Sequence, residues 1–159
     1  MRDQNKNQLS LQVLKKFRII YGSVRQHFRE VERTCGVTGS QLWIMQEIAD
    51  TSGIGVSELA TRLSIHQSTC SQLVEKLVTG KLIIKKRSME DQRRVGLWLS
   101  DEAIELIKKA PNPTEGVLPK ALRNLPTETI QALDSAMGQV IEQLQITDER
   151  LAEKPLSDL

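Results

Sequence analysis

The chain has 159 residues, of which 39% are hydrophobic, 26% are charged and only 3% are aromatic, and its formal net charge is +2. This length suits one domain with a real core, and the shortage of aromatic residues favours helices packed through aliphatic side chains over a β-sandwich. The polar start lacks the apolar stretch of a secretory signal, and no apolar run reaches the roughly 20 residues that cross a bilayer. The two cysteines are too few for a disulfide framework and lack metal-ligand spacing, so we expect the chain to work in the reducing cytoplasm.

The first third of the chain predicts a long amphipathic helix and then a shorter one. Apolar residues recur every three or four positions from Leu9 to Val31, and Gly36 is a stop signal for this helix. Thr38 is the expected N-cap of the second helix, with Gln41 three residues later completing a capping box.

Two short helices joined by a tight turn are predicted next. Ser57 is the expected N-cap of the first, and the turn from Ser64 to Gln67 leads into the second, expected over residues 67–79 and ended by Gly80. The apolar stripe of the second helix packs against the first, so its short polar side chains face outward, as major-groove recognition requires. A helical hairpin with an ordinary solvated face is the alternative.

A basic β-hairpin is predicted after these helices. Strands are expected from Leu82 to Arg87 and from Arg93 to Leu99, where Val95 and Leu97 share the buried face with Leu99. Between Lys81 and Arg94 the sequence has six cations and two acids, whereas residues 101–159 hold 6 Lys/Arg against 11 Asp/Glu. The basic excess suits a polyanionic partner, although a solvated surface would have the same composition.

The last third predicts helices that the central core does not need. Asp101 is the expected N-cap of a helix that is interrupted by Pro111 and Pro113, and a final helix is expected to start at Thr127. Together with the first helix, these segments carry apolar stripes that must be buried. Packing against a second copy is the economical answer, so we expect a homodimer.

Two helices, a tight turn and a hairpin together make a winged helix-turn-helix. The stretches VSELATRLSIHQSTCSQLVEKL (residues 56–77) and RSMEDQRRVGLWLS (residues 87–100), the latter with Asp91-x-Arg93, resemble the MarR (multiple antibiotic resistance regulator) family of bacterial transcription factors. The resemblance covers nearly the whole chain. It implies that Arg93 enters the minor groove, where negative potential is concentrated, and that Asp91 holds the wing in shape by pairing with an arginine.

The chain is therefore expected to be mainly α with a small β-wing: a dimerisation helix (1–37), a winged helix-turn-helix (38–100) and C-terminal dimerisation helices (101–159). It would read a palindromic operator in double-stranded DNA, with residues 67–79 in the major groove and the 82–99 wing in the minor groove, as a repressor. The residues expected to contact DNA are Gln67, Ser68, Thr69, Ser71, Gln72, Lys85, Lys86, Arg87, Asp91, Arg93 and Arg94.

Three positions depart from the family pattern. Ser64 and Ala103 stand where the family usually has glycine, and the break between Pro111 and Pro113 alters how the C-terminal helices reach a partner.

Other roles have weaker signals. The sequence has no phosphate-binding loop, nucleophile–base pair or metal constellation, so we expect neither an enzyme nor a cofactor. The alternative to DNA binding is a winged-helix module for protein contacts, whose binding would be insensitive to salt.

The resemblance also implies a small aromatic or phenolic effector between the dimerisation helices and the winged domain. Trp43 and Trp98 are the candidate contacts, with packing as their alternative role. Cys35 and Cys70 leave open a redox-sensing regulator. His66 is expected to touch phosphate or to cap the recognition helix.

Overall fold

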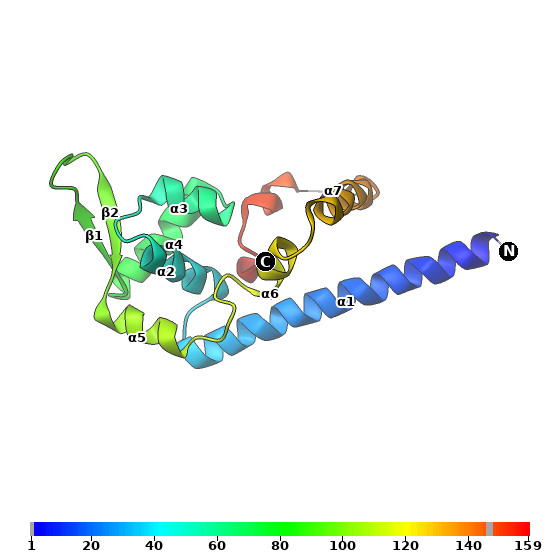
Figure 1. The fold of residues 1–159 in the computed structure, drawn as a ribbon, viewed down its shortest axis with the longest axis horizontal. Helices are drawn as coiled ribbons and strands as arrows, with labels where there is room; N and C mark the ends of the chain where they lie inside the picture. Colours follow the sequence, from blue (N-terminus) through cyan, green and yellow to red (C-terminus); the bar gives the residue numbers. More distant parts are fainter. Residues whose placement is uncertain (1, 146–147) are drawn as a thin grey trace.

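The computed structural model describes residues 2–145 and 148–159 of the chain. Its elements are α1 (Arg2–Cys35), α2 (Gly39–Asp50), α3 (Val56–Leu63), α4 (Gln67–Thr79), β1 (Ile83–Arg87), β2 (Val95–Leu99), α5 (Asp101–Lys109), α6 (Val117–Arg123), α7 (Thr127–Glu142) and the short 3-10 helices η1 (Glu149–Glu153) and η2 (Leu156–Asp158). Figure 1 shows α2–α5 and the hairpin gathered at one end, with α1 projecting far beyond them. The predicted mainly helical fold with a small wing is confirmed.

The hydrophobic core is formed mainly by residues 38–100, the winged unit, and is completed by Val31 of α1 and Ala103 of α5, both fully buried. The expectation that the core does not need the flanking helices is therefore wrong for the end of α1 and for α5. Leu42 and Ile48 of α2 are fully buried, as are Leu59 of α3, Val74 of α4 and Leu97 of β2. Because every element of this unit contributes to one core, α4 and the wing are held in a fixed relation to each other.

The wing is an antiparallel pair in which Ile83 lies opposite Leu99 and Arg87 opposite Val95. A third segment joins it: Ile54 forms a bridge to Leu97, and the Gly53 N–H donates to the Leu97 carbonyl at 2.8 Å. The sequence did not predict this bridge, because a single bridging residue has no periodicity.

One strand expectation is wrong. Val95 was placed on the buried face but is 41% exposed, because it lies where the strand runs out beyond the core toward the wing tip. Leu97 and Leu99, nearer the core, are buried and half-buried.

The helix starts follow local capping chemistry. Thr38 and Gln41 form the predicted capping box of α2. Two other predicted N-caps are wrong: Gly55, not Ser57, precedes α3, and Ser100, not Asp101, caps α5 by accepting from the Ala103 N–H at 3.2 Å. Asp101 lies instead in the first turn, where its charge favours the helix dipole.

The part of the chain that follows α5 is loosely attached to the winged unit, whereas α5 itself packs against α2. Side chains of α7 are exposed along almost its whole length, whereas α6 packs against α1. The last residues then return, and η2 contacts α2. Among the described residues, no helix combines the length and apolar character needed to cross a membrane.

Candidate functional site

The turn between α3 and α4 is tight although Ser64, and not a glycine, stands in it. Ser64 adopts the left-handed conformation, with φ 54° and ψ 45°, that glycine provides more easily. The Ile65 N–H donates to the Ala60 carbonyl at 3.1 Å, which closes the turn. The departure from glycine at Ser64 therefore leaves the turn in place.

The start of α4 is capped by His66. The Ser68 N–H donates to His66 Nδ1 at 3.2 Å, as the capping alternative for this histidine predicted. The helix then covers residues 67–79, the predicted range.

The two faces of α4 divide as expected. Cys70, Leu73, Val74 and Leu77 are buried against the core. Of the predicted DNA contacts, Gln67, Ser68 and Gln72 are exposed, whereas Thr69 and Ser71 are half-buried at the edge of this face. The result is a row of short hydrogen-bonding side chains along one exposed helix face.

Two polar side chains build the wing tip. Ser88 Oγ accepts from the Glu90 and Asp91 N–H groups at 3.2 and 3.4 Å, and Asp91 Oδ1 accepts from the Arg93 N–H at 3.0 Å. The guanidinium paired with Asp91 is that of Arg94, with Nε 3.7 Å from Oδ2, and this pair is largely exposed. Asp91 therefore orders the tip mainly through the backbone, since an exposed ion pair contributes little.

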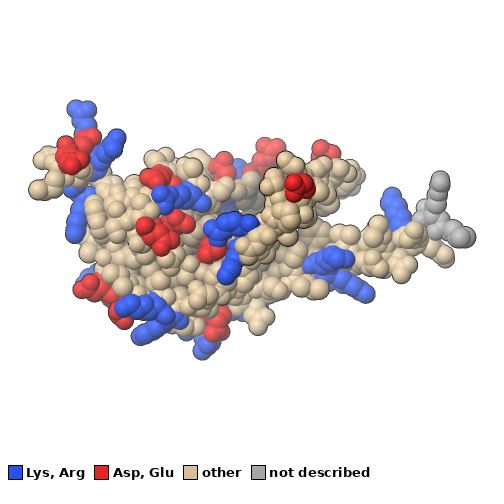
Figure 2. All heavy atoms as spheres, viewed as in Figure 1, with Lys and Arg blue, Asp and Glu red and all other residues tan. Residues whose placement is uncertain are grey.

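The cations of the wing differ in how they are engaged. Lys85 pairs with Glu75 of α4, and Lys86 Nζ lies over the Trp98 ring, 5.5 Å from its centre. Within residues 2–145 and 148–159, the guanidinium groups of Arg87 and Arg93 form no ion pair. Figure 2 shows basic side chains gathered around the wing tip.

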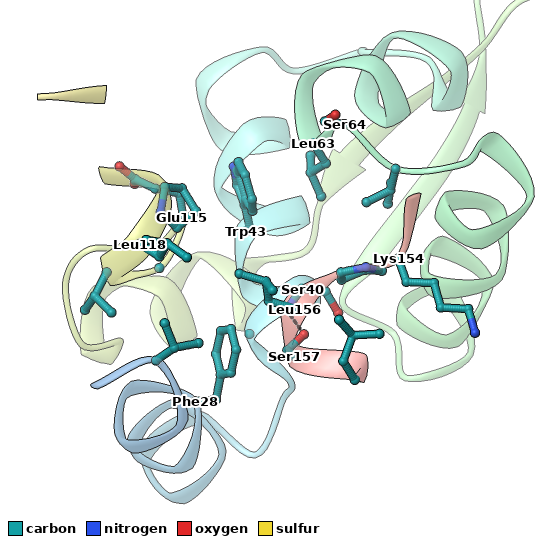
Figure 3. Close-up of a pocket in the computed structure, with 18 of the residues that line it drawn as sticks. Phe28, Ser40, Trp43, Leu63, Ser64, Glu115, Leu118, Lys154, Leu156 and Ser157 are labelled. Atoms are coloured by element: carbon teal, nitrogen blue, oxygen red, sulfur yellow. Dashed lines mark hydrogen bonds between the residues drawn. The ribbon is translucent and has the colours of Figure 1, made fainter. Parts of the chain in front are cut away.

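A cleft of about 450 Å³ lies between α1, α2, α6 and the C-terminal segment. Figure 3 shows the aromatic rings of Phe28 and Trp43 among its lining side chains, with Leu118 from α6. The Trp43 Nε1–H donates to Glu47 Oε1 at 3.1 Å, so its ring orientation is fixed.

The other predicted effector contact, Trp98, does not line this cleft. It packs against Gly96 of the wing and Gly53 of the 51–55 loop, and the Lys86 ammonium lies over its ring. The structure therefore does not bring the two tryptophans together. Trp98 has the alternative role, packing, rather than that of an effector contact in this cleft.

The thiols are in unreactive surroundings. Burial raises the pKa of Cys70 to about 11, and burial also raises the pKa of the half-buried Cys35. Reactive cysteines have a depressed pKa and an exposed thiolate, so neither position favours the redox-sensing alternative.

The C-terminal contacts were missed by sequence reasoning. The Ser40 N–H donates to Ser157 Oγ at 3.0 Å, and Ser40 Oγ donates to Asp158 Oδ1 at 3.1 Å. Residues 148–159 have neither a periodic apolar stripe nor a known motif, so only the folded chain reveals where they dock.

Comparison with known proteins shows the same architecture. A family model described as the MarR family matches residues 36–94, from the start of the winged unit to the wing tip. The transcriptional regulator MgrA of Staphylococcus aureus is 25% identical over 126 residues, covering 79% of this chain and 84% of MgrA. The transcriptional repressor MdtR of Bacillus subtilis is 28% identical over 95 residues, covering 60% of this chain and 57% of MdtR.

A solved structure of a mutant S. aureus MepR, bound to an oligodeoxyribonucleotide, has the same fold. Its TM-score is 0.54 at 20% identity, and the match covers 84% of this chain and 98% of MepR. The helix-turn-helix and the start of the wing therefore match one family model in sequence, and the likeness in fold extends over 84% of the chain. Residues 36–94 match the MarR family, and the chain is similar in sequence to two transcriptional regulators.

Proposed function

We propose that the chain is a homodimeric, sequence-specific DNA-binding repressor. The observation that carries this proposal is the placement of α4 and the wing: one core holds a polar helix face beside a hairpin whose arginines are exposed. A helix of this kind fits the major groove, and an arginine-tipped hairpin fits the minor groove. The names of relatives support the proposal, since MdtR is a repressor and MepR was solved with an oligodeoxyribonucleotide.

The dimer is proposed from exposed apolar surface at the two ends of the chain. On α1, Leu9 is 59% exposed and Ile19 68%, and on α7, Ile141 is 52% exposed. Large apolar side chains repeated along two long helices favour burial against a second copy. Residues 1–37 and 101–159 would then form the dimerisation region, and residues 38–100 the DNA-binding domain.

The cleft is the proposed effector site. Its lining is mainly apolar and includes Phe28 and Trp43, which suits a small aromatic or phenolic molecule. Since α1, α2 and α6 all contribute to it, an occupant would contact both the proposed dimerisation helices and the winged unit.

The decisive experiment selects binding sites from random duplex DNA. The affinity of the chain for the selected sequence is then measured at several salt concentrations. We expect an inverted repeat whose half-sites are centred about 34 Å apart, bound by a dimer, with affinity that falls as salt rises. A monomer at micromolar concentration in sedimentation, or no retained duplex, would overturn the proposal. A protein-interaction module would bind its partner without this salt dependence.

Substitutions separate specificity from affinity. Changes at Ser68 and Gln72 should alter the selected sequence, because these side chains face outward from α4. Lys86→Ala should weaken binding to all sequences alike and reduce the salt slope by about one ion. Lys85→Ala is the comparison: because Lys85 already pairs with Glu75, its removal should change the slope less.

A further inference from the structure

The C-terminal segment, residues 148–159, returns from α7 to the winged unit and contacts it at two places. At the first, Ser157 and Asp158 bind the start of α2. The Ser40 side chain is only 3% exposed, and both its backbone N–H and its hydroxyl donate to this segment. The Asp158 carboxylate also lies near the positive end of the α2 dipole, which favours it. Figure 3 shows Ser157 beside Ser40 at the edge of the cleft.

The second contact is at the recognition helix. The N–H of His66, the N-cap of α4, donates to the Glu153 carbonyl at 3.1 Å. A groove of about 390 Å³ next to it is lined by both Glu153 and Gln67, the first residue of α4. Glu153 therefore lies beside the end of the helix that attracts phosphate.

The charge of the segment opposes DNA. Residues 148–159 contain four carboxylates, at Asp148, Glu149, Glu153 and Asp158, against two cations. Glu153 lies nearest to the start of α4, whereas Asp148 pairs with Arg150 and Asp158 accepts from Ser40 of α2. A duplex that approaches the start of α4 would meet the charge of Glu153 at close range, where salt screens it incompletely.

The docking of the segment is shallow. Leu151, Leu156 and Leu159 line the cleft but stay 45%, 46% and 64% exposed. Since little apolar area is buried, a few hydrogen bonds hold the segment, and local opening should cost much less than global unfolding. The segment is thus suited to reversible release.

We propose that residues 148–159 form an autoinhibitory strap. When docked, the strap places carboxylate charge at the start of the recognition helix and occupies one wall of the cleft. When released, it frees the start of α4 for DNA. This inference rests on the proposed DNA binding and adds its regulation: the measured affinity is the intrinsic affinity reduced by the fraction of molecules whose strap is released.

The test compares DNA affinity of the full chain with that of strap variants. Ser157→Ala combined with Asp158→Ala removes the contacts to Ser40, and Glu153→Gln removes the charge near Gln67 but keeps the backbone bond to His66. Glu149→Gln is the matched control, because it removes one exposed carboxylate of the same segment. A chain ending at residue 147 removes the whole strap, and thermal unfolding checks that each variant folds.

We expect the double variant and the shortened chain to bind DNA about three- to tenfold more tightly. Glu153→Gln should bind about two- to fivefold more tightly, with the gain shrinking at high salt, and the control should change affinity less than twofold. Hydrogen exchange gives a readout without DNA: the amides of Ser40 and His66, which donate to the strap, should exchange faster in the double variant, with neighbouring α2 amides unchanged.

Equal or weaker DNA binding by the double variant and the shortened chain would overturn the strap while leaving DNA binding in place. Unchanged exchange at Ser40 and His66 would also overturn it, because the contacts would then not form in solution. If instead the unmodified chain selects no duplex, the proposed function itself fails, and the exchange measurement still decides whether the strap docks.

Discussion

The Arg93 N–H donates to the Asp91 carboxylate at 3.0 Å, so the acid of the wing fixes the backbone that carries the arginine. Among the described residues, the Arg93 guanidinium has no ion-pair partner. The Asp91 carboxylate, whose charge would otherwise repel phosphate, points into the turn. There its Oδ2 also lies 3.7 Å from Arg94 Nε. The two residues therefore act as a pair in which one shapes the tip and the other is presented by it.

Arg93→Ala should weaken binding to the selected operator by about 1–3 kcal/mol, because a minor-groove arginine contributes both charge and a fit to the narrow groove. The melting temperature should stay nearly constant, since the side chain is exposed at a hairpin tip. Arg93→Lys keeps the charge and should recover only part of the loss. Unchanged affinity of a folded Arg93→Ala variant would refute the minor-groove role.

Asp91→Ala should give a smaller defect of the same kind, because an unpinned tip must be ordered when it binds. Asp91→Asn is the informative comparison: its amide oxygen can still accept from the Arg93 N–H, so it should bind nearly as well as the unmodified chain. Titration at two salt concentrations checks both variants. Tighter binding by Asp91→Ala would instead mean that the carboxylate mainly repels phosphate.

Gly96→Ala should destabilise the winged unit by about 1–3 kcal/mol through overpacking. A Cβ at this position would lie 2.7 Å from the Gly53 carbonyl oxygen and 2.6 Å from the Trp98 ring, and the backbone oxygen cannot easily give way. Chemical denaturation measures the change.

Gly22→Ala is the matched control for this substitution. A Cβ there meets nothing within 4 Å, and the position lies within α1, so the change should be neutral or stabilising by up to about 1 kcal/mol. Equal stability of the Gly96→Ala and unmodified chains would show that the wing does not pack against the 51–55 loop in solution.

The free energy of unfolding should fall as the pH falls through about 6.5. Burial lowers the pKa of His27 in the folded chain, with a weaker opposing effect from a hydrogen bond to the Pro113 backbone. The unfolded chain therefore takes up this proton first, and each pH unit between the unfolded and folded pKa costs at most about 1.4 kcal/mol. Above the unfolded pKa the stability is fully present.

Denaturation at a series of pH values checks this sign. His27→Gln should flatten the slope below pH 6.5, whereas Gln26→Ala, an exposed neighbour on the same helix, should keep it. An unchanged slope in His27→Gln would assign the dependence to other groups.

Local patterns were sufficient to predict much of the winged unit. The apolar stripe that contains Leu73 and Leu77, closed by Gly80, gave the bounds of α4, and alternation around Leu97 gave the second strand. These features are encoded within one element, by periodicity and capping. The two N-cap errors, at Ser57 and Asp101, came from sites where more than one residue could start the helix.

Features that depend on long-range contacts could not be predicted. The bond from Gly53 to Leu97 and the bonds from Ser40 to the C-terminal segment join residues far apart in sequence, and no spacing rule announces them. The same holds for Trp98, because Gly53, Gly96 and Lys86 are brought against its ring only when the chain folds. The packing of the chain ends against a second copy stays a prediction for the same reason.

The separation of Trp43 and Trp98 makes the chain its own spectroscopic probe. One indole lies in the cleft and the other lies under Lys86 on the wing, and the sequence contains no other tryptophan. Replacing either with phenylalanine would leave a single emitter. Fluorescence of the Trp43-only chain would then report events in the cleft, and fluorescence of the Trp98-only chain would report contact at the wing, so the order of the two events could be followed in time.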